Sequence, residues 1–244
     1  MAEEPESDSG HAEDSAGDAQ EWDERYRSHD RLFSGAPNAV LVAEAAGLPP
    51  GRALDVGCGE GADARWLASR GWQVTAVDIS AVALERAAAD AEAAGVASTG
   101  VASTGTEAAA GTESVAGADG AGRVTWTQAD LTTTPPPADA FDLVSAQYFP
   151  LLRQHPGHTA LRGLLAAVAP GGTLLFVGHD LTDLRSSDHA SEVDFDAYYQ
   201  PGEIAGLLGG DWTVLVDETR PRAAPAPAGT HHTHDVVLRA QRVR

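Results

Sequence analysis

The fold of this chain is decided by one stretch, Ala53-Leu54-Asp55-Val56-Gly57-Cys58-Gly59-Glu60-Gly61-Ala62-Asp63. Residues 52–56 predict a strand, the three alternating glycines predict a tight turn, and the Ala-rich amphipathic run 62–70 predicts a helix. Glycine lets the backbone turn without a Cβ clash, and the free N–H groups of the following helix face any ligand on the turn. The stretch therefore predicts a strand, a turn and a helix that together bind a cofactor.

Two classes of cofactor fit a glycine-rich turn of this kind. Gly57, Gly59 and Ala62 satisfy the dinucleotide pattern G-x-G-x-x-G/A in its loosest form. Asp55 and Glu60 favour a different ligand, because their carboxylates repel a diphosphate and attract the ammonium and sulfonium groups of an amino-acid-derived cofactor. The acidic residues thus favour a cationic cofactor.

Three motifs carry a family resemblance. They are the glycine stretch, then Val74-Thr75-Ala76-Val77-Asp78-Ile79-Ser80, then Gln128-Ala129-Asp130-Leu131. In order and spacing they resemble class I S-adenosylmethionine-dependent methyltransferases, over roughly residues 22–242 with one insertion. Within the class, the chain looks most similar to the small-molecule branch that includes tellurite-resistance and thiopurine methyltransferases.

The resemblance implies a fold, a cofactor and a partner. The fold is α/β and doubly wound, a mostly parallel seven-stranded Rossmann-like sheet with an antiparallel last strand. The cofactor is S-adenosyl-L-methionine, and the partner is a small-molecule methyl acceptor whose reacting atom is sulfur, selenium or tellurium, oxygen or nitrogen.

A set of cofactor-binding residues follows from the motifs. Asp78 lies about twenty residues after Gly57, the offset at which an acidic residue can grip a ribose diol; the alternative is an N-cap for the next helix. The resemblance implies that Asp130 accepts a hydrogen bond from the adenine amine, while the backbone N–H of Leu131 donates to a ring nitrogen. The alternative is that Asp130 is a cap or turn residue. The predicted set is Asp55, Gly57, Cys58, Gly59, Gly61, Asp78, Ile79, Asp130, Leu131 and Ala146.

The acceptor side is predicted at the ends of the fourth and fifth strands, 141–145 and 173–177, because open parallel sheets bind ligands outside the carboxyl ends of strands. Gln147, Tyr148 and His179 are the candidate catalytic residues there. His179 lies beside an aspartate and could act as a general base near neutral pH. Methyl transfer to a thiolate, amine or chalcogen oxyanion needs no base where positioning suffices. The alternative role for Gln147 and Tyr148 is packing at the carboxyl edge of the fourth strand.

An N-terminal segment precedes the glycine stretch. Trp22 and Tyr26 are four residues apart and share one helical face. The resemblance implies that they and residues 34–38 form a lid over the cofactor, although Phe33 stands where many relatives carry Trp. The alternative is that these aromatic residues pack a helix onto the sheet.

Domain boundaries follow from composition. Residues 1–20 are acidic and lack periodicity, which predicts a disordered tail, and residues 21–244 form one methyltransferase domain. Within it, residues 95–121 are of low complexity, with 95–99 repeated as 100–104. This segment is predicted to be a mobile insertion without a catalytic role.

The other expected elements are listed by residue range. Helices are predicted at 39–46, 81–94, 161–168 and 195–208, strands at 73–77, 123–127, 212–216 and 235–240, and a turn at 170–172.

Composition excludes several function classes. The net charge of −20 disfavours a nucleic-acid substrate. The chain has no Lys, hence no lysine base, and its single Cys58 cannot form an intramolecular disulfide. No apolar run of membrane length occurs, so a cytoplasmic protein, monomeric or homodimeric and without a membrane partner, is expected. No metal site is predicted, since only two of the histidines at 231, 232 and 234 could share one strand face.

Two other functions remain open from the residues. One is a nicotinamide-dependent oxidoreductase that uses the glycine turn, although the absence of Lys removes the Tyr-x-x-x-Lys constellation of its commonest short-chain form. The other is a protein that binds S-adenosylmethionine without catalysing transfer.

Overall fold

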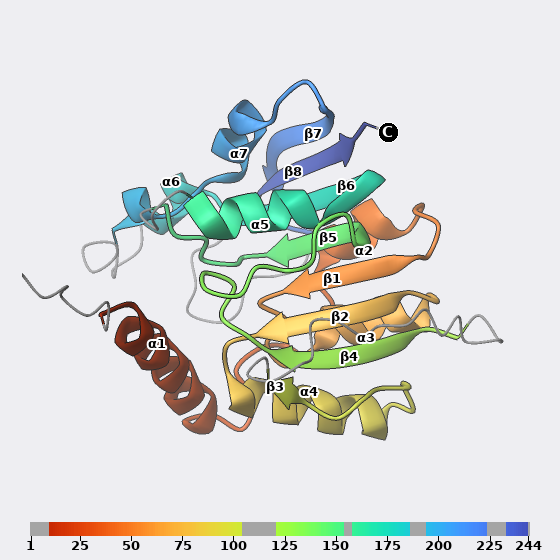
Figure 1. Cartoon of the computed structure of the whole chain (residues 1–244), viewed down its shortest axis with the longest axis vertical. Helices are drawn as coiled ribbons and strands as arrows, with labels where there is room; N and C mark the ends of the chain where they lie inside the picture. Colours follow the sequence, from red (N-terminus) through yellow and green to blue (C-terminus); the bar gives the residue numbers. More distant parts are fainter. Residues whose placement is uncertain (1–9, 104–120, 154–157, 186–193, 224–232, 244) are drawn as a thin grey trace, which may run out of the picture.

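The computed structural model describes residues 10–103, 121–153, 158–185, 194–223 and 233–243. A central sheet carries helices on both faces (Figure 1). The strands are β1 (Arg52–Val56), β2 (Gln73–Asp78), β3 (Ala102–Ser103), β4 (Arg123–Gln128), β5 (Phe141–Gln147), β6 (Val168–His179), β7 (Trp212–Pro221) and β8 (His234–Arg242). The helices are α1 (Gly10–Arg27), α2 (Ala39–Ala45), α3 (Ala62–Ser69), α4 (Ala81–Ala93), α5 (Thr159–Ala167), α6 (Leu181–Arg185) and α7 (Pro201–Leu207).

The strand order in the sheet is β3-β4-β2-β1-β5-β6-β8-β7. Neighbouring strands are parallel from β3 to β6, whereas β8 runs antiparallel to both β6 and β7. This confirms the predicted mostly parallel sheet with an antiparallel last strand. The short β3 adds one strand to the seven expected, so that the described sheet has eight.

The core has two layers because successive strand side chains point to opposite faces. In β1, Ala53 packs in the layer that α2, α3 and α4 cover, while Leu54 packs in the layer under α5 and α7. Both faces of β1 are thus covered, which explains its unbroken run of buried residues.

The functional edge is set by the strand order. After β1 the chain moves to β2 and β4 on one side, and it later places β5 and β6 on the other, so the order reverses at β1. In open α/β sheets a ligand binds outside the carboxyl ends of the strands at such a reversal. Helix α1 lies beyond the ends toward which β1, β2 and β5 point (Figure 1).

The N-terminal helix differs from the sequence prediction. Helix α1 begins at Gly10, within the segment 1–20 that was expected to be a disordered tail. Alanine recurs at positions 12, 16 and 19 and favours helix even without an apolar stripe, which the prediction had required. Residues 1–9 lie outside the described residues.

The predicted insertion at 95–121 is partly a sheet edge. Ser98 forms a bridge with Val124, the N–H of Thr99 donates to the Val124 carbonyl at 2.9 Å, and β3 continues this pairing. The reason is that β4 would otherwise expose a row of unpaired backbone groups. Residues 104–120 lie outside the described residues.

Two predicted boundaries were wrong. The turn expected at 170–172 lies inside β6, where a register shift against β5 accommodates Gly171 at a φ of 81°. The helix expected at 195–208 is a 3-10 turn at Phe195–Ala197 followed by α7, which begins at Pro201. A residue before proline favours an extended backbone, and Gln200 adopts it, so the helix cannot run through.

No helix in the described part of the chain combines the length and the apolar character needed to cross a membrane.

Candidate functional site

The turn after β1 requires glycine. Gly57, Gly59 and Gly61 have φ values of 66°, 51° and 73°, a region that residues with a Cβ rarely adopt. A Cβ on Gly57 would lie 2.6 Å from the Phe149 ring, and one on Gly59 would lie 2.9 Å from the Tyr26 hydroxyl oxygen. The predicted glycines therefore form a turn of bare main chain at the carboxyl edge of the sheet.

Cys58 contributes to this turn through its backbone. Its N–H donates to the Val77 carbonyl at 3.0 Å and its carbonyl accepts from the Gly61 N–H at 2.9 Å. Burial, more than the nearby Asp78 and Asp55 carboxylates, raises the pKa of the Cys58 thiol well above its usual value. The side chain therefore stays a neutral thiol and is no nucleophile at neutral pH.

Three buried carboxylates surround the turn. Asp55, Asp63 and Asp78 are 2%, 6% and 9% exposed. Burial raises the pKa of each, and for Asp55 the neighbouring Asp63 and Asp78 charges add to that rise. A cationic ligand would offset the cost of ionising these carboxylates, so the turn favours a cationic ligand.

The hydrogen bonds of the three carboxylates come from neutral donors. Asp63 accepts from the backbone N–H and side-chain amide of Asn38, at 2.7 and 2.8 Å. Asp78 accepts from the N–H of Gly59 at 2.8 Å and of Ser80 at 2.9 Å.

Asp55 is less well satisfied than its two neighbours. It accepts from the N–H of Ala64, but its Oδ2 atom is buried without a hydrogen-bond partner. A buried carboxylate oxygen left in this state is costly unless a ligand or a proton satisfies it.

The N-terminal segment closes on the turn. In α1, Asp23 accepts from the Ser80 hydroxyl at 2.6 Å and from the Val82 N–H at 3.2 Å. Tyr26 is buried, and its ring meets that of Phe33 edge-on with centroids 6.2 Å apart. Tyr26, one of the two predicted lid aromatics, and Phe33 are thus placed beside Gly59, and Phe33 remains 50% exposed.

Glu60, in the glycine turn, binds the same N-terminal segment through its side chain. Its carboxylate accepts from the backbone N–H groups of Leu32 and Phe33, at 3.4 and 3.2 Å. It also forms an ion pair with Arg86 at 3.2 Å, and the Arg86 guanidinium donates to the His29 carbonyl at 2.9 Å. Glu60 is therefore neutralised by a cation of the protein itself, unlike the three buried aspartates.

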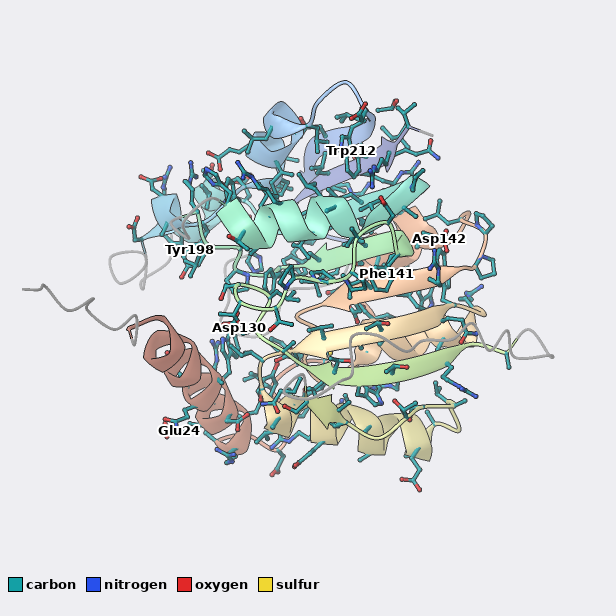
Figure 2. The ribbon with its side chains drawn as sticks, in the orientation of Figure 1. Glu24, Asp130, Phe141, Asp142, Tyr198 and Trp212 are labelled. Atoms are coloured by element: carbon teal, nitrogen blue, oxygen red, sulfur yellow. The ribbon has the colours of Figure 1, made fainter. Side chains whose placement is uncertain are left out.

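Asp78 and Asp130 both have structural roles in this structure. Ser80, rather than Asp78, is the N-cap of α4. Asp130 accepts from the N–H of Thr132 at 2.8 Å and holds a turn, and Figure 2 places it on the α1 side of the sheet. A carboxylate has about four lone-pair sites, so these bonds leave capacity for ligand hydroxyl and amine groups.

The remaining predicted cofactor residues divide into edge and core. Ile79 is half-buried next to Asp78, and its carbonyl accepts from the Gln128 amide at 3.2 Å. Leu131 and Ala146 are buried in the hydrophobic layer under α5. The Ala146 side chain packs in this layer one residue before the end of β5, and its contact with the cofactor stays a prediction.

Tyr148 is the centre of a polar cluster beyond β5. Its hydroxyl donates to the buried Asp235 at 2.7 Å, and Asp235 pairs with Arg222 at 3.3 Å. The Arg222 guanidinium lies 5.1 Å from the Tyr148 ring centre, and the His179 ring stacks on Tyr148 with centroids 4.5 Å apart. The structure therefore brings Tyr148 and His179 together as predicted.

The electrostatics of this cluster keep Tyr148 protonated. Burial and the hydrogen bond to Asp235 raise the pKa of Tyr148 above its ordinary value. Tyr148 also has a φ of 56°, a strained value for a residue with a side chain, which the fixed ring and hydroxyl contacts maintain. Gln147 lies next to it, with its amide donating to the Ser145 hydroxyl at 3.0 Å and its Oε1 buried without a partner.

Sequence reasoning missed Asp63, Asp235 and Arg222. Asp63 had a signal, since an acidic residue in the first turn of the helix after a glycine turn faces the same ligand. Asp235 and Arg222 had none, because both reach Tyr148 through strand pairing. Strand β8 pairs with β6, which sets Asp235 opposite His179, and Arg222 follows β7, which pairs with β8.

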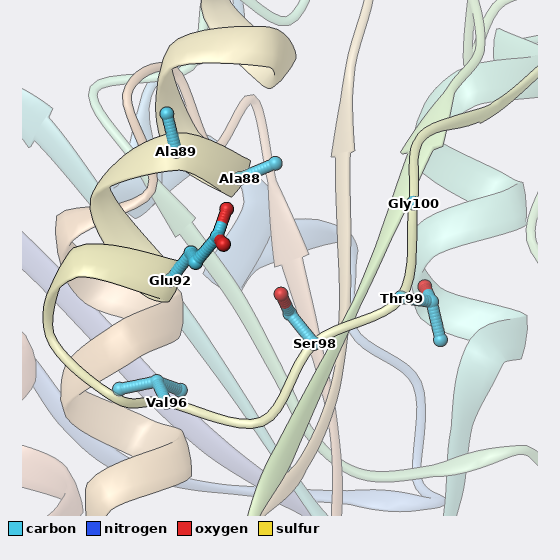
Figure 3. Close-up of a pocket in the computed structure, with 7 residues that line it drawn as sticks. All are labelled: Ala88, Ala89, Glu92, Val96, Ser98, Thr99 and Gly100. Carbon is cyan, nitrogen blue, oxygen red and sulfur yellow. The ribbon is translucent and has the colours of Figure 1, made fainter.

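A separate pocket lies away from this edge. It is lined by Ala88, Ala89, Glu92, Val96, Ser98, Thr99 and Gly100, between the second half of α4 and the segment beside β4 (Figure 3). None of the predicted site residues lines it.

No group of three or more His, Cys, Asp or Glu residues that could hold a metal ion is found in the described ranges. His234 lies 3.4 Å from Asp183, while residues 231 and 232 lie outside the described residues.

Comparison with known proteins adds a family match and fold likenesses. Residues 26–231 match the model of a family described as "Methyltransferase domain". A 54-residue stretch is 45% identical to the ribosomal RNA small subunit methyltransferase C of Alcanivorax borkumensis, and it covers 22% of this chain and 17% of that protein. The match thus spans less than a fifth of the length of that relative.

Solved structures share the fold at low sequence identity. One, described as "Conversion of a Disulfide Bond into a Thioacetal Group during Echinomycin Biosynthesis", has a TM-score of 0.63 at 22% identity, over 92% of this chain and 91% of that one. The N-methyltransferase NodS of Bradyrhizobium japonicum in complex with S-adenosyl-L-homocysteine has a TM-score of 0.60 at 16% identity, covering 92% and 98%. TehB of Haemophilus influenzae has a TM-score of 0.55 at 14% identity, covering 93% and 67%.

Proposed function

Because the chain belongs to the family of methyltransferase domains, we propose that it transfers the methyl group of S-adenosyl-L-methionine to a small-molecule acceptor. The family match confirms the resemblance predicted from the three sequence motifs. The observation that supports the proposed reaction is the buried, unpartnered Oδ2 of Asp55, beside the glycine turn and two more buried carboxylates. A ligand that carries an ammonium and a sulfonium group satisfies this arrangement.

Each cofactor-side residue has a distinct role in the proposal. The bound cofactor supplies an electrophilic methyl group. Asp55 and Asp63 attract its positive charges, and the turn at Gly57 and Gly59 lets the ligand lie against bare main chain. Asp78 accepts from the ribose hydroxyls in addition to holding the turn, and in the same way Asp130 accepts from the adenine amine.

The acceptor side is assigned to the Tyr148 cluster. Tyr148 positions His179 rather than reacting itself, since its hydroxyl proton is held by Asp235. His179 takes a proton from acceptors whose nucleophile carries one. The free lone pairs of the Gln147 Oε1 accept from an N–H or O–H group of the acceptor, which orients it.

The acceptor is a small molecule rather than a nucleic acid in this proposal. The net charge of −20 repels a phosphate backbone, and the similarity to an rRNA methyltransferase covers a fifth of the chain. The acceptor atom is sulfur, selenium or tellurium, nitrogen or oxygen. A first panel therefore contains thiols, disulfides, tellurite, selenite, primary amines and phenols.

Calorimetric titration with S-adenosyl-L-methionine, S-adenosyl-L-homocysteine and NAD tests the cofactor. We expect the first two to bind and NAD not to bind. Binding of NAD alone would support the alternative of a nicotinamide-dependent oxidoreductase. Binding without methyl transfer to any member of the panel would favour the non-catalytic alternative.

His179→Gln is expected to lower kcat by about 100-fold toward an acceptor that must lose a proton, because a positioned general base contributes roughly 10²–10⁴-fold. The affinity for S-adenosyl-L-methionine is expected to remain unchanged. Steady-state rates of labelled methyl transfer, together with calorimetry, measure both quantities. An unchanged kcat would show that His179 removes no proton.

A further inference from the structure

The three buried aspartates at the glycine turn have no cationic partner. Glu60 pairs with Arg86, but Asp55, Asp63 and Asp78 form no ion pair in the ranges that the structure describes. Neutral N–H groups are their only hydrogen-bond donors there. Full ionisation would therefore place three uncompensated negative charges in a buried site, which is costly.

The surroundings of Asp55 supply no compensating charge. The groups that face it or lie next to it are Asp63 on α3, Asp78 on β2, Cys58 in the turn, and Ser145 opposite it on β5. Tyr26 on α1 lies near Asp78 and Glu60, and burial raises its pKa. Arg65 on α3 donates to the Glu60 carbonyl and pairs with Asp90, so it is occupied elsewhere.

We propose that Asp55, supported by Asp63 and Asp78, makes this site prefer the sulfonium cofactor over its thioether product, and that cofactor binding releases a proton from Asp55. The inference rests on the proposed function, because it assumes that the ligand is S-adenosyl-L-methionine. It goes further, because it assigns to the carboxylates the discrimination between the ligand that enters and the ligand that leaves.

The charge change of the reaction supplies the discrimination. During transfer, the bond between sulfur and the methyl carbon breaks and its electron pair stays on sulfur, while a lone pair of the acceptor forms the new bond to carbon. The cofactor thereby loses its sulfonium charge and keeps its ammonium and carboxylate groups. The site formed by Asp55, Asp63 and Asp78 then lacks one positive charge. Asp55 therefore takes a proton from solvent, and the neutral thioether is held less tightly.

Calorimetry of the full chain with three ligands tests this proposal without knowledge of the acceptor. The ligands are S-adenosyl-L-methionine, S-adenosyl-L-homocysteine, and sinefungin, in which an amine-bearing carbon replaces the sulfonium. At pH 7.5 we expect the sulfonium ligand to bind about tenfold more tightly than the thioether. The affinity of sinefungin should be close to that of the sulfonium ligand, because its added amine is positively charged. Titrations in buffers of different ionisation enthalpy should show more proton release for the two charged ligands.

Asp55→Asn keeps the shape and the acceptor for the Ala64 N–H but removes the charge. We expect the preference for the sulfonium ligand to fall to less than about threefold and the proton release to disappear. The matched control is Asp142→Asn, an exposed aspartate at the amino end of β5, on the far side of the sheet from Asp130 (Figure 2). Its ligand preference should equal that of the wild type.

The melting temperature of the ligand-free protein tests the cost of the Asp55 charge separately. Burial raises the pKa of Asp55 in the folded state, so its stabilising protonated form is present at low pH and lost as pH rises through the folded pKa. The melting temperature of Asp55→Asn should therefore exceed that of the wild type at pH 8, by a margin that shrinks toward pH 4.

The outcomes separate the two proposals. Equal affinities for the sulfonium and thioether ligands in the wild type, or a preference that persists in Asp55→Asn, would overturn the inference and leave the proposed function standing. Failure of the wild type to bind any of the three ligands, with the expected melting behaviour of Asp55→Asn, would reject the proposed function instead.

Discussion

Asp78→Ala is expected to weaken binding of S-adenosyl-L-methionine by at least about 100-fold, which corresponds to roughly 3 kcal/mol. The wild-type carboxylate holds the turn, because it accepts from the N–H of Gly59 and of Ser80. Hydrogen bonds to a charged group contribute about 1.5–3 kcal/mol each. Alanine removes these bonds together with those proposed to the ribose hydroxyls.

The stability of the ligand-free protein should change much less than its affinity. Removal of Asp78 leaves the N–H donors of Gly59, Ile79 and Ser80 without this acceptor, which destabilises the turn. It also removes a buried carboxylate whose pKa burial raises, which relieves part of the charge cost. The two effects oppose each other, so we expect a change in the free energy of unfolding of about 1 kcal/mol.

Calorimetry and thermal unfolding of three variants measure these effects. Asp78→Asn retains one oxygen acceptor and should lie between the wild type and Asp78→Ala in affinity. The control is Asp142→Ala, whose carboxylate accepts from the Arg52 N–H at 2.8 Å at the opposite edge of the sheet. If Asp78→Ala bound the cofactor as tightly as the control, the ribose would have to lie elsewhere.

The central strands could be predicted from sequence because their signals are local. Parallel strands buried on both faces read as short apolar runs, and the glycines that follow β1 mark its end. The predicted strands 73–77, 123–127 and 141–145 agree with β2, β4 and β5 to within two residues at each end. Tertiary context decided the elements that were missed, such as the start of β6, which extends through Gly171 because β5 offers it a partner.

In the candidate site, too, some residues could be predicted from local signals and others depend on tertiary context. The glycines, Asp55 and Asp78 follow from spacing along the chain, and the structure places all of them at one edge. The link between Tyr148 and Asp235 joins residues 87 positions apart. It depends on the antiparallel entry of β8, which no local pattern near either residue indicates.

The glycine turn after β1 also depends on tertiary packing, because a core residue lies directly behind it. Gly61 needs a positive φ, and a Cβ there would lie 2.5 Å from the Trp126 ring. Trp126 comes from β4, is fully buried, and so forms the wall against which the turn is built. The proposed cofactor site therefore depends on Trp126, a core residue that is not among the predicted cofactor-binding residues.

Trp126→Ala is expected to lower the free energy of unfolding by about 3–5 kcal/mol, because it leaves a large cavity in the layer that α3 and α4 cover. The indole Nε1 is buried without a hydrogen-bond partner, so its removal offsets a small part of that loss. For a chain of this length the melting temperature should fall by about 6–20 °C. Loss of the wall behind Gly61 should also weaken cofactor binding.

Trp66→Ala is the matched control, since Trp66 is half-buried on α3 with the Arg70 guanidinium 5.3 Å from its ring centre. Its loss should cost less than about 2 kcal/mol, because solvent fills most of the space that the ring leaves. Calorimetric melting and cofactor titration of both variants give the two quantities. If the two variants lost equal stability, Trp126 would be no more than an ordinary apolar contact, and the dependence of the glycine turn on the β4 core would be wrong.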